Sequence, residues 1–149
     1  MPTHYPGDER ERRGLNAYIT LMRASDACLA VLERELAARG LSSTQLGVLE
    51  ALLHLGALCQ GTLSQKLLRT GASTTSVVAG LERRGLVVRQ RTREDRRFVR
   101  VALTGRGRKL IEAVFPDHVR SICRLLAALT AEEQEQLRRL CRKLGTSVA

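Results

Sequence analysis

Apolar residues recur at helical spacing through the first third of the chain. Over residues 15–38 they stand three, four or seven positions apart, which predicts a helix with one apolar face, and Gly40 supplies its stop. Residues 42–45 have the Ser-x-x-Gln form of a capping box. A second helix is therefore expected to begin there and to end near Gly56.

Two shorter helices are expected next. Thr62 is interpreted as the cap of a helix over residues 63–69, and Thr70 as the cap of another over residues 71–84. Gly85 should end the second of them, because glycine adopts the left-handed conformation that closes many helices.

The spacing of apolar residues then changes from the helical value to two. A strand is expected to start at Val87, and a second is expected around residues 99–103, where apolar side chains alternate along the chain. The charged residues 92–97 lie between them. This stretch therefore predicts a two-stranded hairpin with a charged turn.

Two helices complete the pattern. Thr104 is expected to cap a long helix that runs to about residue 129 and is kinked at Pro116. Residues 130–133 form a further capping box, Thr-Ala-Glu-Glu, which opens the last helix. Residues 1–13 are polar and contain proline and glycine, so we expect a mobile arm there.

This order predicts a mainly α fold with a small β-hairpin in a single domain of residues 1–149. Residues 42–103 correspond to a winged helix-turn-helix region, a module that binds duplex DNA. The helices that flank it, over residues 14–40 and 104–146, are apolar on one face but too few to form a bundle by themselves. We therefore expect them to be dimerisation helices.

The chain carries a formal net charge of +10, and this excess is confined to one segment. Residues 62–109 hold 13 lysines and arginines against three acidic residues, whereas the rest of the chain holds 12 of each. Such segregation favours a localised surface for a polyanion over scattered solubilising charge. Aromatic residues make up only 3% of the chain, which argues against the stacking of single-stranded bases and favours double-stranded DNA as the partner.

Several other classes of protein are not indicated by the sequence. No stretch reaches the roughly 20 apolar residues of a membrane span, and no apolar segment typical of a signal peptide stands near the start, so we expect no membrane association. We find no phosphate-binding loop, pair of catalytic carboxylates or nucleophile–base constellation, so the chain is not expected to be an enzyme. No cofactor is expected.

The four cysteines are far apart and form no Cys-x-x-Cys pair, so we expect reduced thiols and a cytoplasmic protein. Two His-x4-Cys spacings would place their members on different faces of a helix, and no metal site is expected from them. Cys28, Cys123 and Cys141 fall in expected helices and are interpreted as small buried hydrophobes. Cys59 precedes the DNA-binding helices and is the redox candidate.

The helix expected over residues 71–84 has two different faces. One side should face the core, and its members are Thr74, Val77, Val78 and Leu81. The opposite side carries small residues, hydroxyl groups and Arg83, and no acid stands before Glu82, so this side could enter a major groove and bond base edges. An ordinary solvated helix face is the alternative.

The preceding helix also offers groups for DNA. Thr62 and Ser64 are expected near its N-terminus, where hydroxyl and amide groups can hold a phosphate, and Thr62 could serve as a plain cap as well. The residues predicted to contact DNA are Thr62, Ser64, Gln65, Lys66, Ser73, Thr75, Ser76, Arg83, Arg91, Arg93, Asp95, Arg96 and Arg97.

Residues 70–105 resemble the signature of the MarR (multiple antibiotic resistance repressor) family of bacterial transcriptional regulators. The motifs that carry the resemblance are LERRGLV at residues 81–87, the Asp-x-Arg turn at 95–97 and VALTGRG at 101–107. In outline the similarity extends over residues 15–145, including the order of the helices.

The resemblance implies an obligate homodimer in which the first, fifth and sixth helices interlock. It also implies a pseudo-palindromic operator, with one recognition helix in each half-site and the wing in the neighbouring minor groove. By this match Arg97 is the minor-groove arginine and Asp95 is the acid that orients it. The alternative is that these two residues only stabilise the hairpin turn.

The resemblance further implies a regulator, typically a repressor, that a small aromatic or phenolic ligand releases from DNA. The expected pocket lies between the first, second and fifth helices, with Tyr18, Arg23, His54 and His118 as candidate ligand-binding residues. Two alternatives stay open, namely a regulator that senses oxidants through cysteine and a non-specific architectural DNA-binding protein. Tyr18 stands where the family's organic-hydroperoxide sensors carry their reactive cysteine, so that particular mechanism is not supported.

Overall fold

Helices make up most of the chain, together with one small antiparallel sheet. The computed structural model describes residues 2–67, 71–94 and 97–148. The elements are α1 (Glu9–Ala37), α2 (Ser43–Leu55), β1 (Leu58–Cys59), α3 (Gln60–Lys66), α4 (Gly71–Arg83), β2 (Val87–Arg91), β3 (Val99–Leu103), α5 (Gly105–Leu126) and α6 (Ala131–Val148). This confirms the mainly α fold with a winged helix-turn-helix region that the sequence predicts.

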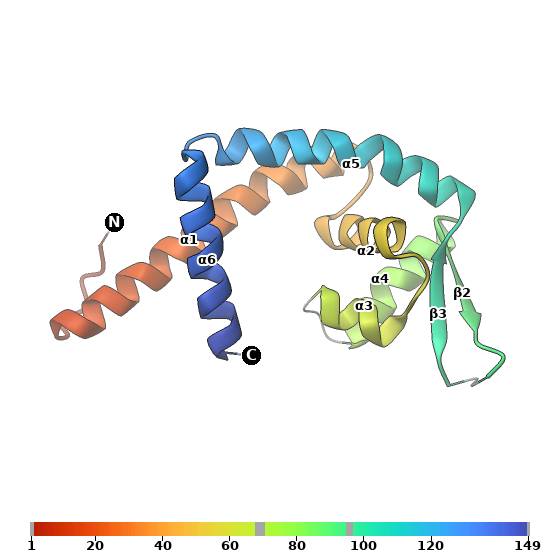
Figure 1. Cartoon of the computed structure of the whole chain (residues 1–149), viewed down its shortest axis with the longest axis horizontal. Helices are drawn as coiled ribbons and strands as arrows, with labels where there is room; N and C mark the ends of the chain where they lie inside the picture. Colours follow the sequence, from red (N-terminus) through yellow and green to blue (C-terminus); the bar gives the residue numbers. More distant parts are fainter. Residues whose placement is uncertain (1, 68–70, 95–96, 149) are drawn as a thin grey trace.

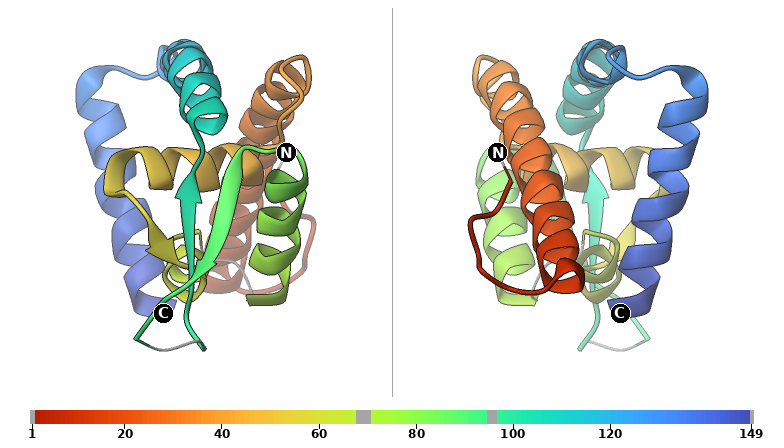
Figure 2. Two further views of the ribbon diagram at one scale, coloured as in Figure 1. Left: turned by 90° about the vertical axis from the view of Figure 1, so that its right-hand side faces the viewer. Right: turned by 90° about the vertical axis from the view of Figure 1, so that its left-hand side faces the viewer.

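The helices form two groups in space (Figure 1). The short helices α2, α3 and α4 gather with the sheet at one end, whereas α6 lies beside the first half of α1 at the other. The long helix α5 connects the two groups, and the second half of α1 packs against it. In both views of Figure 2 the hairpin of β2 and β3 projects from the body of the chain.

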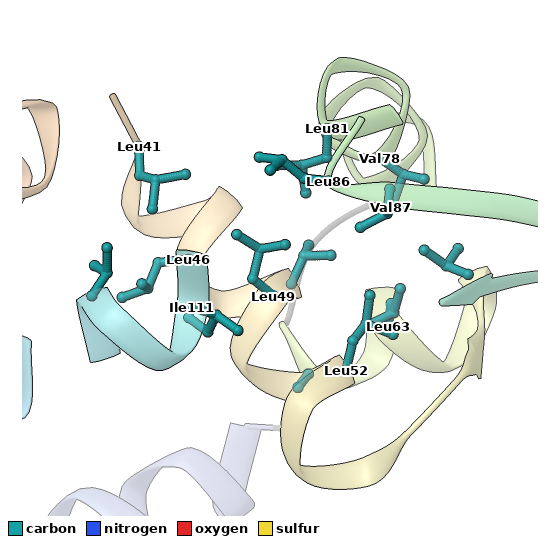
Figure 3. Close-up of a cluster of buried hydrophobic side chains, with 14 of the residues drawn as sticks. Leu41, Leu46, Leu49, Leu52, Leu63, Val78, Leu81, Leu86, Val87 and Ile111 are labelled. Atoms are coloured by element: carbon teal, nitrogen blue, oxygen red, sulfur yellow. The ribbon is translucent and has the colours of Figure 1, made fainter. Parts of the chain in front are cut away.

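The core lies where α2 meets α3, α4, the sheet and the start of α5 (Figure 3). Its fully buried side chains come from all of these elements and include Leu49, Leu52, Leu63, Val78, Leu81, Val87, Val101 and Ile111. Burying one such side chain contributes about 1.5–3 kcal/mol. This cluster therefore fixes the position of α3, α4 and the hairpin relative to one another.

Gly107 allows the first turn of α5 to lie directly against the backbone of Leu86, between α4 and β2. A Cβ atom at this position would overlap the carbonyl group of Leu86. Thr104 fixes the same turn, because its Oγ1 accepts a hydrogen bond from the Gly107 N–H at 3.0 Å and donates one to the Gly85 carbonyl at 2.7 Å. The first turn of α5 is thus tied to the loop that leaves α4.

The sheet has three strands in the order β1–β3–β2, all antiparallel to their neighbours. In the hairpin, Val87 pairs with Leu103 and Arg91 with Val99. The expected hairpin is present, but the sheet is larger than predicted, because Leu58 and Cys59 add a third strand beside β3. A strand of two residues is too short to show an alternating pattern in the sequence.

The first helix begins earlier than expected. Asp8 and Glu11 form a capping box, in which Asp8 Oδ1 accepts from the Glu11 N–H at 2.8 Å and Glu11 Oε2 accepts from the Asp8 N–H at 2.9 Å. Residues 9–13 are therefore helical and do not belong to an arm. Ahead of them, the Thr3 N–H donates to Asn16 Oδ1 at 2.6 Å.

The boundaries of the later helices also differ in part. Cys59, and not Thr62, stands at the N-cap of α3, where it makes no side-chain capping bond, so the chain turns helical without the usual cap residue. The expected cap at Thr70 lies outside the described residues. The fifth helix ends at Leu126, earlier than expected, and continues through Pro116.

Other predicted helix starts are confirmed. Ser42 and Gln45 exchange both hydrogen bonds of a capping box, at 3.0 and 3.1 Å. Thr130 and Glu133 do the same at the start of α6, at 2.8 and 3.2 Å. Across the described ranges, no helix is both long and apolar enough to cross a membrane.

Candidate nucleic-acid interface

Helix α4 has one buried and one exposed side, as the sequence predicts. Thr74, Val78 and Leu81 are almost completely buried. The exposed residues on the other side are Ser73, Thr75, Ser76 and Arg83. This side therefore presents hydroxyl groups and a guanidinium to any surface that approaches it.

Gly85 ends the helix and redirects the chain into the hairpin. Its φ angle of +72° lies in the left-handed region that favours glycine. The Gly85 and Leu86 N–H groups donate to the carbonyls of Glu82 and Leu81, at 2.9 and 3.0 Å. The LERRGLV motif is thus a helix end followed by the first residue of β2.

Glu82 joins α4 to the wing strand β2. Its carboxylate accepts hydrogen bonds from the Arg89 N–H at 3.0 Å, from Arg89 Nε at 3.2 Å and from a terminal guanidinium nitrogen at 3.0 Å. The Arg89 side chain, followed by its backbone N–H, holds the pKa of the Glu82 carboxyl below its usual value. These bonds fix the angle between α4 and the hairpin.

Helix α3 contributes polar groups beside α4. Gln65 and Lys66 are exposed, as a phosphate-binding role requires. Ser64 is half-buried and its Oγ donates to the Gln60 carbonyl at 3.2 Å. Thr62 is half-buried and lines a hollow of about 520 Å3 between the start of α3 and the wing.

The wing presents several arginines to solvent. Arg91, Arg93 and Arg97 are exposed, and the Thr92 N–H donates to the Phe98 carbonyl at 3.2 Å across the hairpin. The predicted sites Asp95 and Arg96 lie outside the described residues, so the expected pairing of Asp95 with Arg97 stays a prediction.

The candidate ligand-binding residues fall in different places. Tyr18 lies in a hollow of about 400 Å3 between α1 and α6, and Arg23 is exposed on α1. His54 of α2 meets Phe115 of α5 edge to face, with ring centroids 5.4 Å apart, and His118 follows Phe115 at 6.4 Å. The structure thus brings the two histidines to one aromatic ring and separates them from Tyr18.

His118 also faces a charged notch of about 220 Å3 between α1 and α5. Its lining residues are Glu35, Leu36, Arg39, Val114, Asp117, His118, Arg120, Ser121 and Arg124. Burial lowers the pKa of His118, and the nearby Glu35 carboxylate partly opposes this shift. Arg124 pairs with Glu35 at 3.0 Å, whereas Asp117 pairs with Arg39 and Arg120.

The prediction that three of the cysteines are buried is wrong for the single chain. In the single chain Cys123 and Cys141 are exposed and Cys28 is half-buried, so none of these three is a buried hydrophobe there. The reason is that the parts of α1, α5 and α6 that carry them lie outside the core cluster. Cys59 is half-buried beside Phe98. Within the described ranges, no three His, Cys, Asp or Glu side chains are grouped to hold a metal ion.

Three residues near this surface were missed by sequence reasoning. Glu82 and Arg89 form the bond between α4 and β2, and Gln60 donates a hydrogen bond to Thr75. Each pair joins two elements whose relative placement no local pattern shows. The one local hint was that Glu82 is the only acidic residue in the sequence of residues 71–84.

Comparisons with known proteins agree with this geometry. The family model for the MarR family matches residues 39–97. The HTH-type transcriptional regulator YkoM of Bacillus subtilis is 30% identical over 138 residues, which cover 93% of this chain and 90% of the relative.

Two solved structures have the same fold. One is BpsR of Bordetella bronchiseptica, whose DNA binding is regulated by 6-hydroxynicotinic acid. It superimposes with a TM-score of 0.80 at 26% sequence identity, and the matched region covers 87% of this chain and 98% of the BpsR chain. S. aureus MepR in complex with DNA has a TM-score of 0.79 at 26% identity, over 88% and 96% of the two chains. The relatives are regulators and not enzymes, and this chain belongs to the MarR family of DNA-binding, winged helix-turn-helix transcriptional regulators.

Proposed function

We propose that this regulator is a homodimeric repressor that reads a pseudo-palindromic operator with the exposed side of α4 and grips the flanking DNA with the wing. One observation carries the proposal. The exposed residues of α4 are hydroxyl-bearing or basic, and the bonds between Glu82 and Arg89 hold the basic wing at a fixed angle to them. A rigid pair of contacts suits adjacent major and minor grooves.

Phosphate contacts supply the affinity in this proposal. Exposed basic side chains stand on α3, on α4 and on the wing, and they include Lys66, Arg83, Arg91, Arg93 and Arg97. If each copy neutralises about three phosphates, six contacts give a slope of log affinity against log salt of about −5. Binding should therefore weaken steeply between low and physiological salt.

A second copy of the chain is proposed to cover α1 and α6. None of the residues of α6, all of them described, is buried, and its apolar side chains Leu137, Leu140 and Leu144 are exposed in the single chain. On α1, Tyr18, Met22 and Leu29 are exposed as well. Two amphipathic helices with exposed apolar faces are best stabilised by burial in an interface.

A small planar anion is proposed to regulate DNA binding. The notch beside His118 carries three arginines and two carboxylates together with Ser121, and its apolar lining residues are Leu36 and Val114. An aromatic carboxylate could exchange for the acidic side chains that now pair with these arginines. The regulation of BpsR by 6-hydroxynicotinic acid shows that a protein of this fold responds to such a compound.

Binding measurements test the proposal directly. Light scattering during gel filtration should give the mass of a dimer, and the protein should select a two-fold symmetric sequence from a random duplex library. Random duplex should compete poorly with the selected sequence. Equal competition by random duplex would instead indicate a non-specific architectural protein, and a mass that corresponds to a monomer at micromolar concentration would contradict the proposed homodimer.

A further inference from the structure

The first residue of α3 reaches across to the middle of the exposed side of α4. Gln60 Nε2 donates a hydrogen bond to Thr75 Oγ1. Gln60 itself is half-buried, whereas Thr75 is exposed. The contact therefore brings a carboxamide onto the surface to which the proposed function assigns base reading.

Both partners of this hydrogen bond stand on fixed backbone. The Gln60 carbonyl accepts from Ser64 Oγ at 3.2 Å, and Cys59, which precedes it, pairs with Arg100 in the sheet. Helix α3 is anchored in the core by Leu63, and α4 in the same way by Val78 and Leu81. The carboxamide is thus held in place before DNA arrives, which reduces the entropy lost on binding.

The remaining hydrogen-bonding groups of Gln60 match a particular base. A carboxamide has two N–H donors and one carbonyl acceptor, and Thr75 uses one of the donors. Within the part of the chain that the structure describes, Gln60 Oε1 receives no hydrogen bond. One donor beside one acceptor complements the major-groove edge of adenine, which offers N7 as acceptor and the N6 amino group as donor.

We propose that Gln60 and Thr75 read the operator as one unit and that the Gln60 carboxamide specifies an adenine in each half-site. Thr75 positions the carboxamide, and the carboxamide carries the base preference. This inference rests on the proposed function, because it requires α4 to lie in the major groove.

Selection of duplexes from a random library by the full-length protein supplies both the operator and its base preferences. With Gln60→Ala, the preference for adenine should fall by about tenfold at one position in each half-site, while the other positions keep theirs. With Gln60→Glu, the side chain becomes an acceptor that complements the cytosine amino group, so the preferred base at that position should change from adenine to cytosine. Gln90→Ala, at an exposed glutamine of β2, should leave the profile unchanged.

Thr75→Val tests whether the two residues act together. Valine keeps the shape of threonine but cannot accept the hydrogen bond from Gln60, so the same adenine preference should weaken. The double variant should lose no more of this preference than Gln60→Ala alone, since the two changes remove one shared interaction. Equal thermal midpoints for all variants would show that each has folded.

Two results would overturn the inference while leaving the proposed function intact. In the first, Gln60→Ala weakens binding by the same factor for every base at every position, as loss of a phosphate contact would do. In the second, the base preferences of the Gln60→Ala variant equal those of the wild-type protein at every position. If the wild-type protein selects no consensus sequence, the proposed function itself fails and this inference fails with it.

Discussion

Replacing Leu140 by alanine tests whether α6 forms half of a dimer interface. Leu140 is 65% exposed in the single chain. Burying a whole leucine side chain is worth about 1.5–3 kcal/mol, so covering the exposed part of this one is worth about 1–2 kcal/mol. Because a two-fold interface contains each residue twice, the variant should weaken the dimer by about 2–4 kcal/mol.

This energy corresponds to a roughly 30- to 1000-fold increase in the Kd of the dimer. Sedimentation velocity of fluorescently labelled protein, over nanomolar to micromolar concentrations, measures that constant. Val88→Ala is the matched control, since Val88 is 36% exposed on the wing strand β2, away from α6. If Leu140→Ala and Val88→Ala dimerise with the same Kd as the wild type, the exposed face of α6 is not the interface.

Three further predictions concern the wing and its supports. Arg97→Ala should weaken operator binding by about tenfold in a gel shift while gel filtration still shows a dimer, and unchanged affinity would remove Arg97 from the interface. Because the arginine bonds lower the pKa of the Glu82 carboxyl on folding, their stabilisation is present above the ordinary glutamate pKa and is lost as the pH falls through the lowered value. Glu82→Gln should therefore melt below the wild type at neutral pH, and the difference should shrink on acidification; a constant difference would contradict this origin. Gly107→Ala should destabilise the fold by about 1–3 kcal/mol in chemical denaturation, because its Cβ would meet a fixed backbone carbonyl. Gly105→Ala should leave the free energy of unfolding nearly unchanged, because a Cβ at that position meets no neighbouring atom. Equal losses of stability in the two variants would refute the packing explanation.

Local features of the chain were readable from the sequence. Ser42 with Gln45 and Thr130 with Glu133 form the expected capping boxes, because such boxes lie within four consecutive residues. The buried side of α4 was also predicted, since Val78 and other apolar residues of that helix recur at its period.

Other features depended on contacts between distant segments or on weak local patterns. The bond from Gln60 to Thr75 joins two different helices, and no periodicity in the sequence places these helices side by side. Leu58 and Cys59 form a strand because they pair with β3, which is distant in the sequence. The Asp8 capping box was local and readable, but the polar composition of residues 1–13 favoured an arm over a helix start.

The candidate ligand-binding residues are a further case in which contacts between distant segments could not be predicted from local patterns. Tyr18 and His118 both lie on long helices with an apolar period, but which stretch of α1 meets α5 is decided by packing. The prediction that they share a pocket therefore used helix order alone. In the single chain, each lines a hollow that the other does not.

The measurement that tests the central claim most directly is the ratio of affinities for the selected operator and for a shuffled duplex at physiological salt. We expect a ratio of at least about 1000 for the wild type, and a fall of about tenfold or more when Thr75 and Ser76 are both replaced by alanine. A wild-type ratio near one, or a ratio that the double replacement leaves unchanged, would contradict the claim that the exposed side of α4 reads DNA sequence.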